Sequence, residues 1–319
     1  MKKILITGAC GYLGARLSKN LAEKGYEVHV FDSFDPSKYS QWASLMAEII
    51  VGDIRDEKTV SDLANKQFDL VIHLISLDYL KSKDNPNVVS SINVMPTWNL
   101  LDKLTKNGLK KFIYFSTIHV YGGHVSKITK ECQTPKPHNV YGLTHLLSEN
   151  ICSYFNDKTE TQCINLRLSN TYGSPIFNEN NCWWLVINDL VRTAFNERRI
   201  KLISDGSPQR DFIHGDDVVK AIEILINYQK NISKNILHIA SGQTLTILEL
   251  AHLIKKLYYK RYNNEIDIFL PDNSVSTNPR KFKDIPSYKF SVEKMNKIGF
   301  KQKIDLESGI NELFQYFES

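Results

Sequence analysis

Short apolar runs alternate with longer segments of mixed polarity along the first 116 residues of the chain. Five of the runs have the length of buried strands, and they cover residues 3–7, 27–31, 48–52, 69–74 and 111–116. Between them, helical spacing of the apolar residues covers residues 15–24, about 57–66 and about 87–107. Strands separated by helices are typical of a parallel, doubly wound sheet, so the pattern predicts an α/β fold.

A glycine-rich turn joins the first predicted strand to the first predicted helix. Gly8, Gly11 and Gly14 are spaced three residues apart in TGACGYLG. In such a unit the first glycine permits a tight turn, the second lets the backbone approach a pyrophosphate, and the third lets the helix pack on the strand. The turn therefore predicts a dinucleotide site, with the loop residues Gly8, Gly11, Tyr12, Leu13 and Gly14.

The second predicted strand is followed by an acidic residue, Asp32. It lies about 20 residues beyond the glycine turn, where a carboxylate binds both ribose hydroxyls of NAD. The same negative charge repels the 2′-phosphate of NADP, so we expect NAD as the cofactor.

Composition and charge exclude several other classes of protein. The 319 residues include 40 Lys and Arg against 35 Asp and Glu, and the basic residues are dispersed, so we expect no nucleic-acid partner. No apolar stretch approaches the roughly 20 residues that a membrane span needs. The five cysteines contain no Cys-x-x-Cys pair, which indicates reduced thiols in the cytoplasm and no zinc site. We therefore expect a cytoplasmic protein that binds no metal.

Several sequence blocks resemble the extended short-chain dehydrogenase/reductase family, in particular its NAD-dependent nucleotide-sugar epimerases and dehydratases. They are TGACGYLG, GDIRD at 52–56, FSTIHVYG at 115–122, LRLSNTYG at 166–173, QRDFIHGDDV at 209–218 and KMNKIGF at 294–300. The resemblance implies a Rossmann domain of residues 1–175 plus about 210–245. It also implies a smaller α/β C-terminal substrate lobe of residues about 176–209 plus 246–319.

The resemblance assigns binding roles to single residues. Asp53 and Ile54 match positions that hold the adenine of the cofactor. Asn170 and Arg210 match residues that bind the diphosphate of a sugar nucleotide. A further phosphate-binding arginine of relatives falls on the pair Arg280 and Lys281, and the sequence leaves open which of the two binds.

Catalytic roles follow from the same resemblance. Thr117 matches the catalytic Ser or Thr, and Tyr141 matches the acid/base tyrosine. Relatives usually carry a lysine four residues after this tyrosine, which lowers its pKa and binds the ribose of the nicotinamide, whereas this chain has His145. With a reference pKa near 6.5, a histidine is only about one-quarter protonated at pH 7. Two interpretations stay open: His145 serves catalysis and cofactor binding, or it marks a loss of catalysis.

The block after Thr117 separates the reactions of the family. Relatives that eliminate water carry Asp-Glu directly after the Thr, and decarboxylases carry Glu just before the Val, but this chain has Ile118 and His119. His119 is either an acid or base facing the sugar or an ordinary loop histidine. Chemistry at carbon 4 needs only the tyrosine and the cofactor.

The sequence thus predicts an NAD-dependent enzyme that epimerises, oxidises or reduces carbon 4 of a nucleotide-diphosphate sugar for surface-polysaccharide precursors. The alternative is a catalytically weakened NAD-binding sensor or scaffold, which His145 favours. The resemblance also implies a homodimer, because dimers built from two helices of each chain are common in the family.

Overall fold

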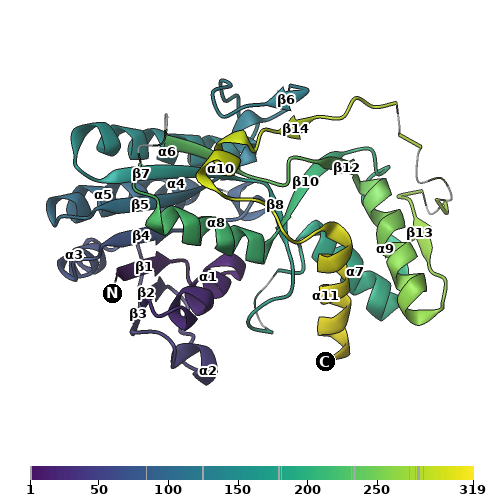
Figure 1. Ribbon diagram of the computed structural model, residues 1–319, viewed down its shortest axis with the longest axis horizontal. Helices are drawn as coiled ribbons and strands as arrows, with labels where there is room; N and C mark the ends of the chain where they lie inside the picture. The colour runs from purple at the N-terminus through teal and green to yellow at the C-terminus, as the bar shows by residue number, and fades with distance from the viewer. Residues whose placement is uncertain are drawn as a thin grey trace.

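The computed structural model describes residues 2–83, 85–123, 126–178, 180, 182–230, 232, 235–272, 274–276, 278, 281–282 and 284–319. Figure 1 shows a larger layered part, which contains the N-terminus, beside a smaller part formed mainly by later segments. The chain ends on the last helix of the smaller part.

A seven-stranded parallel sheet forms the centre of the larger part (Figure 1). Its strand order is β3-β2-β1-β4-β5-β7-β11, so the order reverses between β1 and β4. The strands are β1 (Lys3–Thr7), β2 (Glu27–Asp32), β3 (Glu48–Val51), β4 (Leu70–His73), β5 (Lys111–Thr117), β7 (Gln162–Leu168) and β11 (Ile236–Ile239). Open α/β sheets bind ligands at the carboxyl ends of the strands beside such a reversal, which is where the glycine turn lies.

Helices cover both faces of this sheet, so its strands are apolar on both sides. One face is covered by α1 (Tyr12–Glu23), α8 (Gly215–Asn227) and α10 (Glu293–Ile298). The other face is covered by α3 (Glu57–Asn65), α4 (Pro86–Asn93), α5 (Met95–Lys106) and α6 (Val140–Lys158). Neighbouring residues of one strand enter opposite layers: Ile4 and Ile6 belong to the core on the α1 side, and Leu5 belongs to the core on the α5 side.

The smaller part has a core of its own. Its helices are α7 (Val186–Glu197), α9 (Ile247–Tyr262) and α11 (Leu306–Glu318). They pack with two small sheets, β8 (Asn170–Tyr172) with β10 (Gln209–His214) and β12 (Thr244–Thr246), and β9 (Arg199–Lys201) with β13 (Asp267–Phe269). The remaining elements are α2 (Ser40–Ala43), the short helices η1 (Lys81–Lys83) and η2 (Ile118–Tyr121), and the strand pair β6 (Ile128–Thr129) and β14 (Lys289–Phe290).

The observed packing differs from the sequence expectation in three places. The helix expected over residues 87–107 is two helices, α4 and α5, because Pro96 has no N–H for the helical bond to the residue four positions earlier. Helix α1 begins at Tyr12, earlier than the expected residue 15. Met295 and Phe300, expected in the substrate lobe, belong to the core of the large sheet.

Candidate active site

The glycine turn after β1 has the close contacts that its spacing predicts. Gly8 has a φ of +72°, which L side chains rarely adopt. A Cβ at Gly14 would lie 2.1 Å from the carbonyl oxygen of Gly8, so only glycine lets α1 start this close to the strand. Helix α1 has no side-chain cap and no acidic residue in its first turn. Its first N–H groups are therefore available to an anionic ligand.

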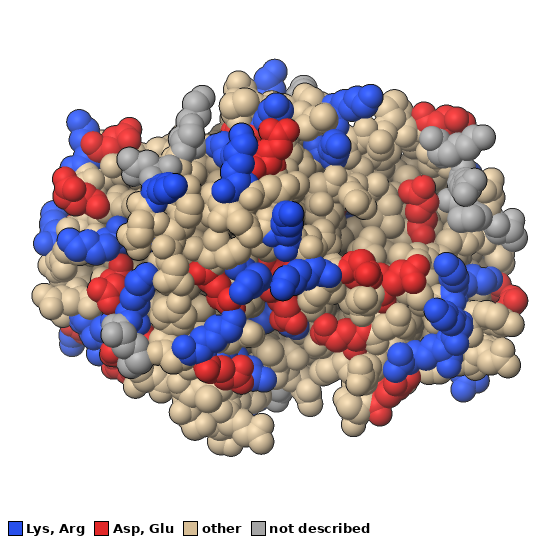
Figure 2. Space-filling view, viewed as in Figure 1, with Lys and Arg blue, Asp and Glu red and all other residues tan. Residues whose placement is uncertain are grey.

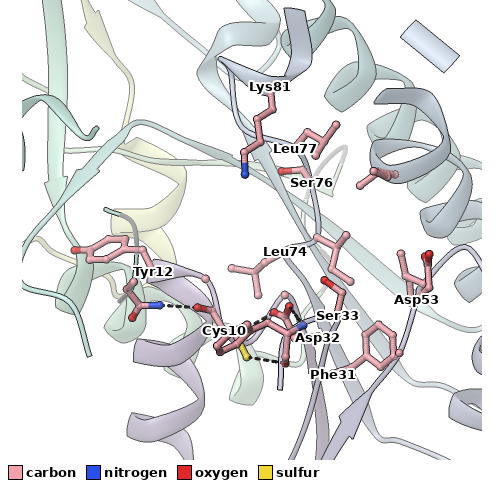
Figure 3. A pocket seen from close by; sticks show the side chains of 18 of the residues that line it. Cys10, Tyr12, Phe31, Asp32, Ser33, Asp53, Leu74, Ser76, Leu77 and Lys81 are labelled. Atoms are coloured by element: carbon pink, nitrogen blue, oxygen red, sulfur yellow. Dashed lines mark hydrogen bonds between the residues drawn. The ribbon is translucent and has the colours of Figure 1, made fainter. Parts of the chain in front are cut away.

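A cavity of about 690 Å³ opens beside this turn (Figure 3). Its size is that of a ligand site rather than a packing defect. Figure 3 shows Asp32 and Ser33 at the end of β2 and Asp53 across the cavity, and Lys81 extends into the cavity from above. The walls combine apolar side chains with these and further polar ones, among them Lys38, Arg55 and Asn180, which suits a nucleotide.

Asp32 is fixed at the mouth of the turn by backbone hydrogen bonds. Its carboxylate accepts from the N–H of Cys10 at 2.9 Å and from the N–H of Phe34 at 3.2 Å. Across the cavity, Asp53 accepts a forked hydrogen bond from Arg55, which holds the pKa of Asp53 below its ordinary value. Each carboxylate is therefore placed on the cavity wall, and Ile54 lines the same wall.

A second cavity, of about 320 Å³, adjoins the first and shares the glycine turn with it. Thr117 at the end of β5 and Tyr141 in the first turn of α6 both line it. Burial raises the pKa of Tyr141 to about 12, a hydrogen bond with Thr117 opposes that rise, and the charge of Asp78 adds to it. The structure thus brings the two residues together but keeps the tyrosine protonated.

His145 lies one helical turn after Tyr141 and lines the same cavity. The two rings meet edge to face with centroids 4.5 Å apart. The side chain is 2% exposed, and burial lowers its pKa to about 3. The other influences that lower it are the nearby imidazoles of His119 and His73. His145 is therefore a neutral imidazole, in contrast to the charged lysine of relatives.

His119 faces the same cavity from η2. Its ring stands edge to face with Tyr141 at a centroid distance of 5.7 Å, and Tyr79 lies 5.7 Å from it on another side. Burial lowers the pKa of His119 to about 4, and the charge of Arg210 adds to this effect. His119 is thus a neutral group beside the tyrosine rather than a distant loop residue.

Of the described residues expected to bind substrate, only Asn170 lines the second cavity. Asn170 lines the second cavity, and its amide donates to the carbonyl of Asp211 at 2.9 Å. Arg210 lies on β10, close enough to His119 to lower that pKa. Lys281 lies over the ring of Phe282 and does not line either cavity. Arg280 lies outside the described residues.

Some site residues gave no signal in the sequence. Lys38 and Lys81 line the larger cavity, although single lysines outside a recognised motif are ordinarily solvated. Tyr114 hydrogen-bonds His145 from the middle of β5 at 2.8 Å, where the sequence indicated only a buried strand. The strand register, which sets Tyr114 level with His73, could have indicated a polar row across the sheet.

A polar cluster joins the two parts of the molecule beside the site. Arg16 of α1 pairs with Asp216 at the start of α8, and His214 pairs with Glu312 of α11 at 3.0 Å. Among the described residues, His214, Asp216 and Glu312 form the one group spaced closely enough for a metal ion. Arg16 also lies 4.0 Å from Glu312, so these atoms already have partners within the cluster, which is a polar link between the parts.

Residues 4–240 match the NAD dependent epimerase/dehydratase family. The chain belongs to this family. The family and the α/β fold expected from the sequence are thereby confirmed.

The names of several similar proteins describe enzymes that act on nucleotide sugars. A putative UDP-glucose 4-epimerase of Methanocaldococcus jannaschii is 24% identical over 318 residues, which cover 99% of this chain and 98% of the relative. A UDP-N-acetyl-alpha-D-glucosaminuronate decarboxylase of Bacillus cytotoxicus is 27% identical, with coverage of 99% and 98%. The UDP-glucose 4-epimerase of Thermotoga maritima, solved with UDP-glucose, has a TM-score of 0.83 at 25% identity, with coverage of 99% and 98%.

The face of the molecule in Figure 2 has no large patch of one charge among its described residues. Among the described residues on the face in Figure 2, Lys and Arg are interspersed with Asp and Glu. No helix in the described part of the chain combines the length and apolarity needed to cross a membrane.

Proposed function

We propose that this protein is an NAD-dependent enzyme that epimerises, oxidises or reduces carbon 4 of a nucleotide-diphosphate sugar, for surface-polysaccharide precursors. One observation carries the proposal: the cavity beside the glycine turn continues into a cavity that holds both Thr117 and Tyr141. The names of the relatives, which include UDP-glucose 4-epimerases, support the class of substrate.

The residues of the larger cavity suit NAD. The uncapped start of α1 offers N–H groups to the diphosphate. Glycine at position 14 keeps the helix this close to the turn, because a Cβ there would clash with the carbonyl oxygen of Gly8. Asp32 would accept from the adenosine ribose hydroxyls, and Asp53 and Ile54 would border the adenine. Lys81, which extends into the cavity, would lie toward the negative diphosphate.

The chemistry assigned to this chain is proton transfer at one oxygen. Tyr141, as phenolate, takes the proton of the carbon 4 hydroxyl while the hydrogen on that carbon leaves with its electron pair. Thr117 hydrogen-bonds Tyr141 and thus orients its oxygen. NAD, when bound, would supply the acceptor for that hydride and a positive charge near the tyrosine. For epimerisation, Tyr141 would give the proton back to the carbon 4 oxygen after the sugar has presented its opposite face.

The sugar nucleotide would be held from the substrate side by Asn170 and Arg210. Asn170 lines the second cavity, and Arg210, which does not line it, lies close enough to His119 for its charge to lower the pKa of that histidine. The planar guanidinium of Arg210 suits two oxygens of a diphosphate. Neither Ile118 nor His119 is a carboxylate, so the proposal is limited to carbon 4.

A second function, as an NAD-binding sensor or scaffold, is favoured by the neutral state of His145 and the high pKa of Tyr141. Incubation with UDP-, GDP-, CDP- and dTDP-sugars, followed by NMR identification of products, separates the two. Conversion of one sugar nucleotide supports the enzyme. NAD binding with no conversion of any sugar supports the sensor or scaffold.

The proposal includes a homodimer formed through α5 and α6. These helices pack on each other, and their outer face exposes Met95, Trp98, Leu143, Leu147 and Tyr154. Trp98 stacks on Tyr154 with ring centroids 5.7 Å apart. An apolar face of this kind on two adjacent helices suits a second copy of the same face.

A further inference from the structure

The wall of the second cavity carries a negative charge without a matching positive one. Among its described lining residues, Asp78 is the one acidic residue, and there is no lysine or arginine. The two histidines of the wall, His119 and His145, have pKa values lowered to about 4 and about 3, so both are neutral near pH 7. The protein therefore presents one carboxylate, and no side chain of opposite charge, to a ligand in this cavity.

Asp78 lies in the loop between β4 and η1, and its side chain is held by that loop. Its Oδ1 accepts from the N–H of Leu80 and from the N–H of Lys81, each at 2.9 Å. Bonds of this kind fix an aspartate in a turn. Its Oδ2 lies 4.0 Å from Nζ of Lys81, which is beyond hydrogen-bonding distance. The side chain is 25% exposed, so Oδ2 can accept from a ligand.

The charge of Asp78 reaches the reacting end of the cavity. It is one of the influences that raise the pKa of Tyr141, so the carboxylate lies near that hydroxyl. Under the proposed function, carbon 4 of the sugar lies at Tyr141. Carbon 6 of a hexose is joined to carbon 4 through carbon 5 alone. A group on carbon 6 therefore comes within the influence of Asp78, whichever way the rest of the sugar is turned.

A carboxylate on carbon 6 would meet unfavourable surroundings here. Two negative charges repel each other, and the repulsion is strongest where water is excluded. A carboxylate that leaves water also needs a cation to offset its lost hydration. Hydroxyl groups of the wall can donate to it but do not neutralise it. A neutral group on carbon 6 has neither cost, and a sugar hydroxyl can donate to Oδ2 of Asp78.

Three nearby cations are directed to other partners. Lys81 extends into the larger cavity, where it would lie toward the diphosphate of NAD. Nζ of Lys83 lies over the ring of Tyr79, 4.8 Å from its centroid. Arg210 would bind the diphosphate of the substrate under the proposed function. None of the three lines the second cavity.

We propose that Asp78 is a specificity-determining residue, which favours nucleotide-diphosphate hexoses that carry no carboxylate and rejects those of uronic acids. The proposal rests on the proposed function, because that function places carbon 4 at Tyr141. It narrows the class of substrate: a neutral sugar gains an acceptor for a hydroxyl proton, and a uronic acid meets a like charge. Repulsion of this kind separates ligands of similar shape.

Calorimetric titration with UDP-glucose and UDP-glucuronate tests the proposal. If free UDP does not bind, free GDP, CDP and dTDP identify the base, and a hexose and its uronate are compared on that base. The protein is loaded with NADH, which cannot accept hydride and has an uncharged nicotinamide. We expect the uronate to bind about tenfold or more weakly than the hexose. In Asp78→Asn, which keeps the shape and an acceptor for the loop N–H groups, we expect this ratio to fall about tenfold, through tighter binding of the uronate.

Asp205→Asn is the matched control. Asp205 also accepts from a backbone N–H of its own turn, that of Ser207, but it is exposed and lines neither cavity, so the ratio should stay as in the natural protein. Equal or tighter binding of the uronate by the natural protein overturns the proposal, whether or not Asp78→Asn folds. An unchanged ratio in folded Asp78→Asn also overturns it. Failure of all four nucleoside diphosphates and their sugars to bind would instead overturn the proposed function, and this inference with it.

Discussion

Tyr141 lies in surroundings that oppose the loss of its proton. It is buried, Asp78 adds a negative charge nearby, and the closest imidazole, His145, is neutral. The family resemblance predicts a positively charged lysine at position 145; under the proposed function, that charge would come with the oxidised cofactor instead. At the level of single residues, the proposed acid/base group is in place, but its surroundings do little to stabilise its ionised form.

This arrangement predicts a particular pH dependence. Formation of NADH from substrate should rise between about pH 6 and 9, because more Tyr141 is deprotonated as the pH approaches its raised pKa. No descending limb should arise from His145, whose pKa of about 3 lies below this window. His145→Lys should move the rising limb to lower pH. A falling limb above neutral pH that disappears in His145→Gln would contradict the neutral imidazole.

Asp32 should determine the choice of cofactor. Its carboxylate repels the extra phosphate of NADP, whereas Lys38 and Arg55, which also line the cavity, attract that phosphate. Asp32→Ala should therefore reduce the preference for NAD about tenfold or more, measured by calorimetry with both cofactors. Asp32→Asn is the matched control for shape, since its amide oxygen can still accept from Cys10 N–H. Equal or tighter binding of NADP by the unchanged protein would contradict the role of Asp32.

The sequence predicted which residues gather at the site better than it predicted their state. The spacing of Tyr141 and His145 on one helix already placed both on one face. The loss of charge on His145 was not predictable, because it depends on how completely α6 and β5 bury the ring. For Lys281 the sequence predicted a binding role but not the position of the side chain. The fold places that side chain over the ring of Phe282, and it lines neither cavity.

Among the elements, those of the large sheet were the most predictable. A buried parallel strand is a continuous apolar run, so β1, β2 and β4 stand out from their flanking polar residues. The break between α4 and α5 was missed because apolar spacing continues across it. The short strands β8, β12 and β13 have three residues each and carry too little pattern to be recognised.

The exposed face of α5 and α6 gives a prediction at this level. Trp98→Glu places a charge at the centre of the proposed helical interface, next to Tyr154. It should convert a dimer to a monomer, as measured by analytical ultracentrifugation, because burying an unpaired carboxylate is unfavourable. Tyr259→Glu on α9, whose side chain is also about half exposed, should leave the mass unchanged. A monomeric natural protein at all concentrations would contradict the interface.

For the molecule as a whole, buried neutral histidines and paired carboxylates link stability to pH. Burial lowers the pKa of His73, His145 and His238 to about 3. Their ordinary value is near 6.5, so the unfolded chain takes up protons first as the pH falls. Glu312, which links α11 to His214, has a pKa of about 2 and adds to the effect below about pH 4.5.

The free energy of unfolding should therefore change little near pH 7 and fall steadily below about pH 6.5. Urea unfolding at a series of pH values measures this. In His73→Asn the decline between about pH 6.5 and 4 should be shallower, because one buried imidazole no longer favours the protonated unfolded chain. A stability that stays constant down to about pH 4.5 would contradict the neutral burial of these histidines.

The central claim is that Tyr141 takes the proton of the carbon 4 hydroxyl of a sugar nucleotide while the hydrogen on carbon 4 passes as hydride to bound NAD. Single-turnover measurement of NADH absorbance, with substrate carrying deuterium at carbon 4, tests it most directly once the product panel has named the sugar. We predict slower NADH formation from the deuterated substrate, and a loss of about 10²-fold or more in Tyr141→Phe with NAD affinity retained. NADH formation at the natural rate in Tyr141→Phe, or no effect of the deuterium in the chemical step, would contradict the account.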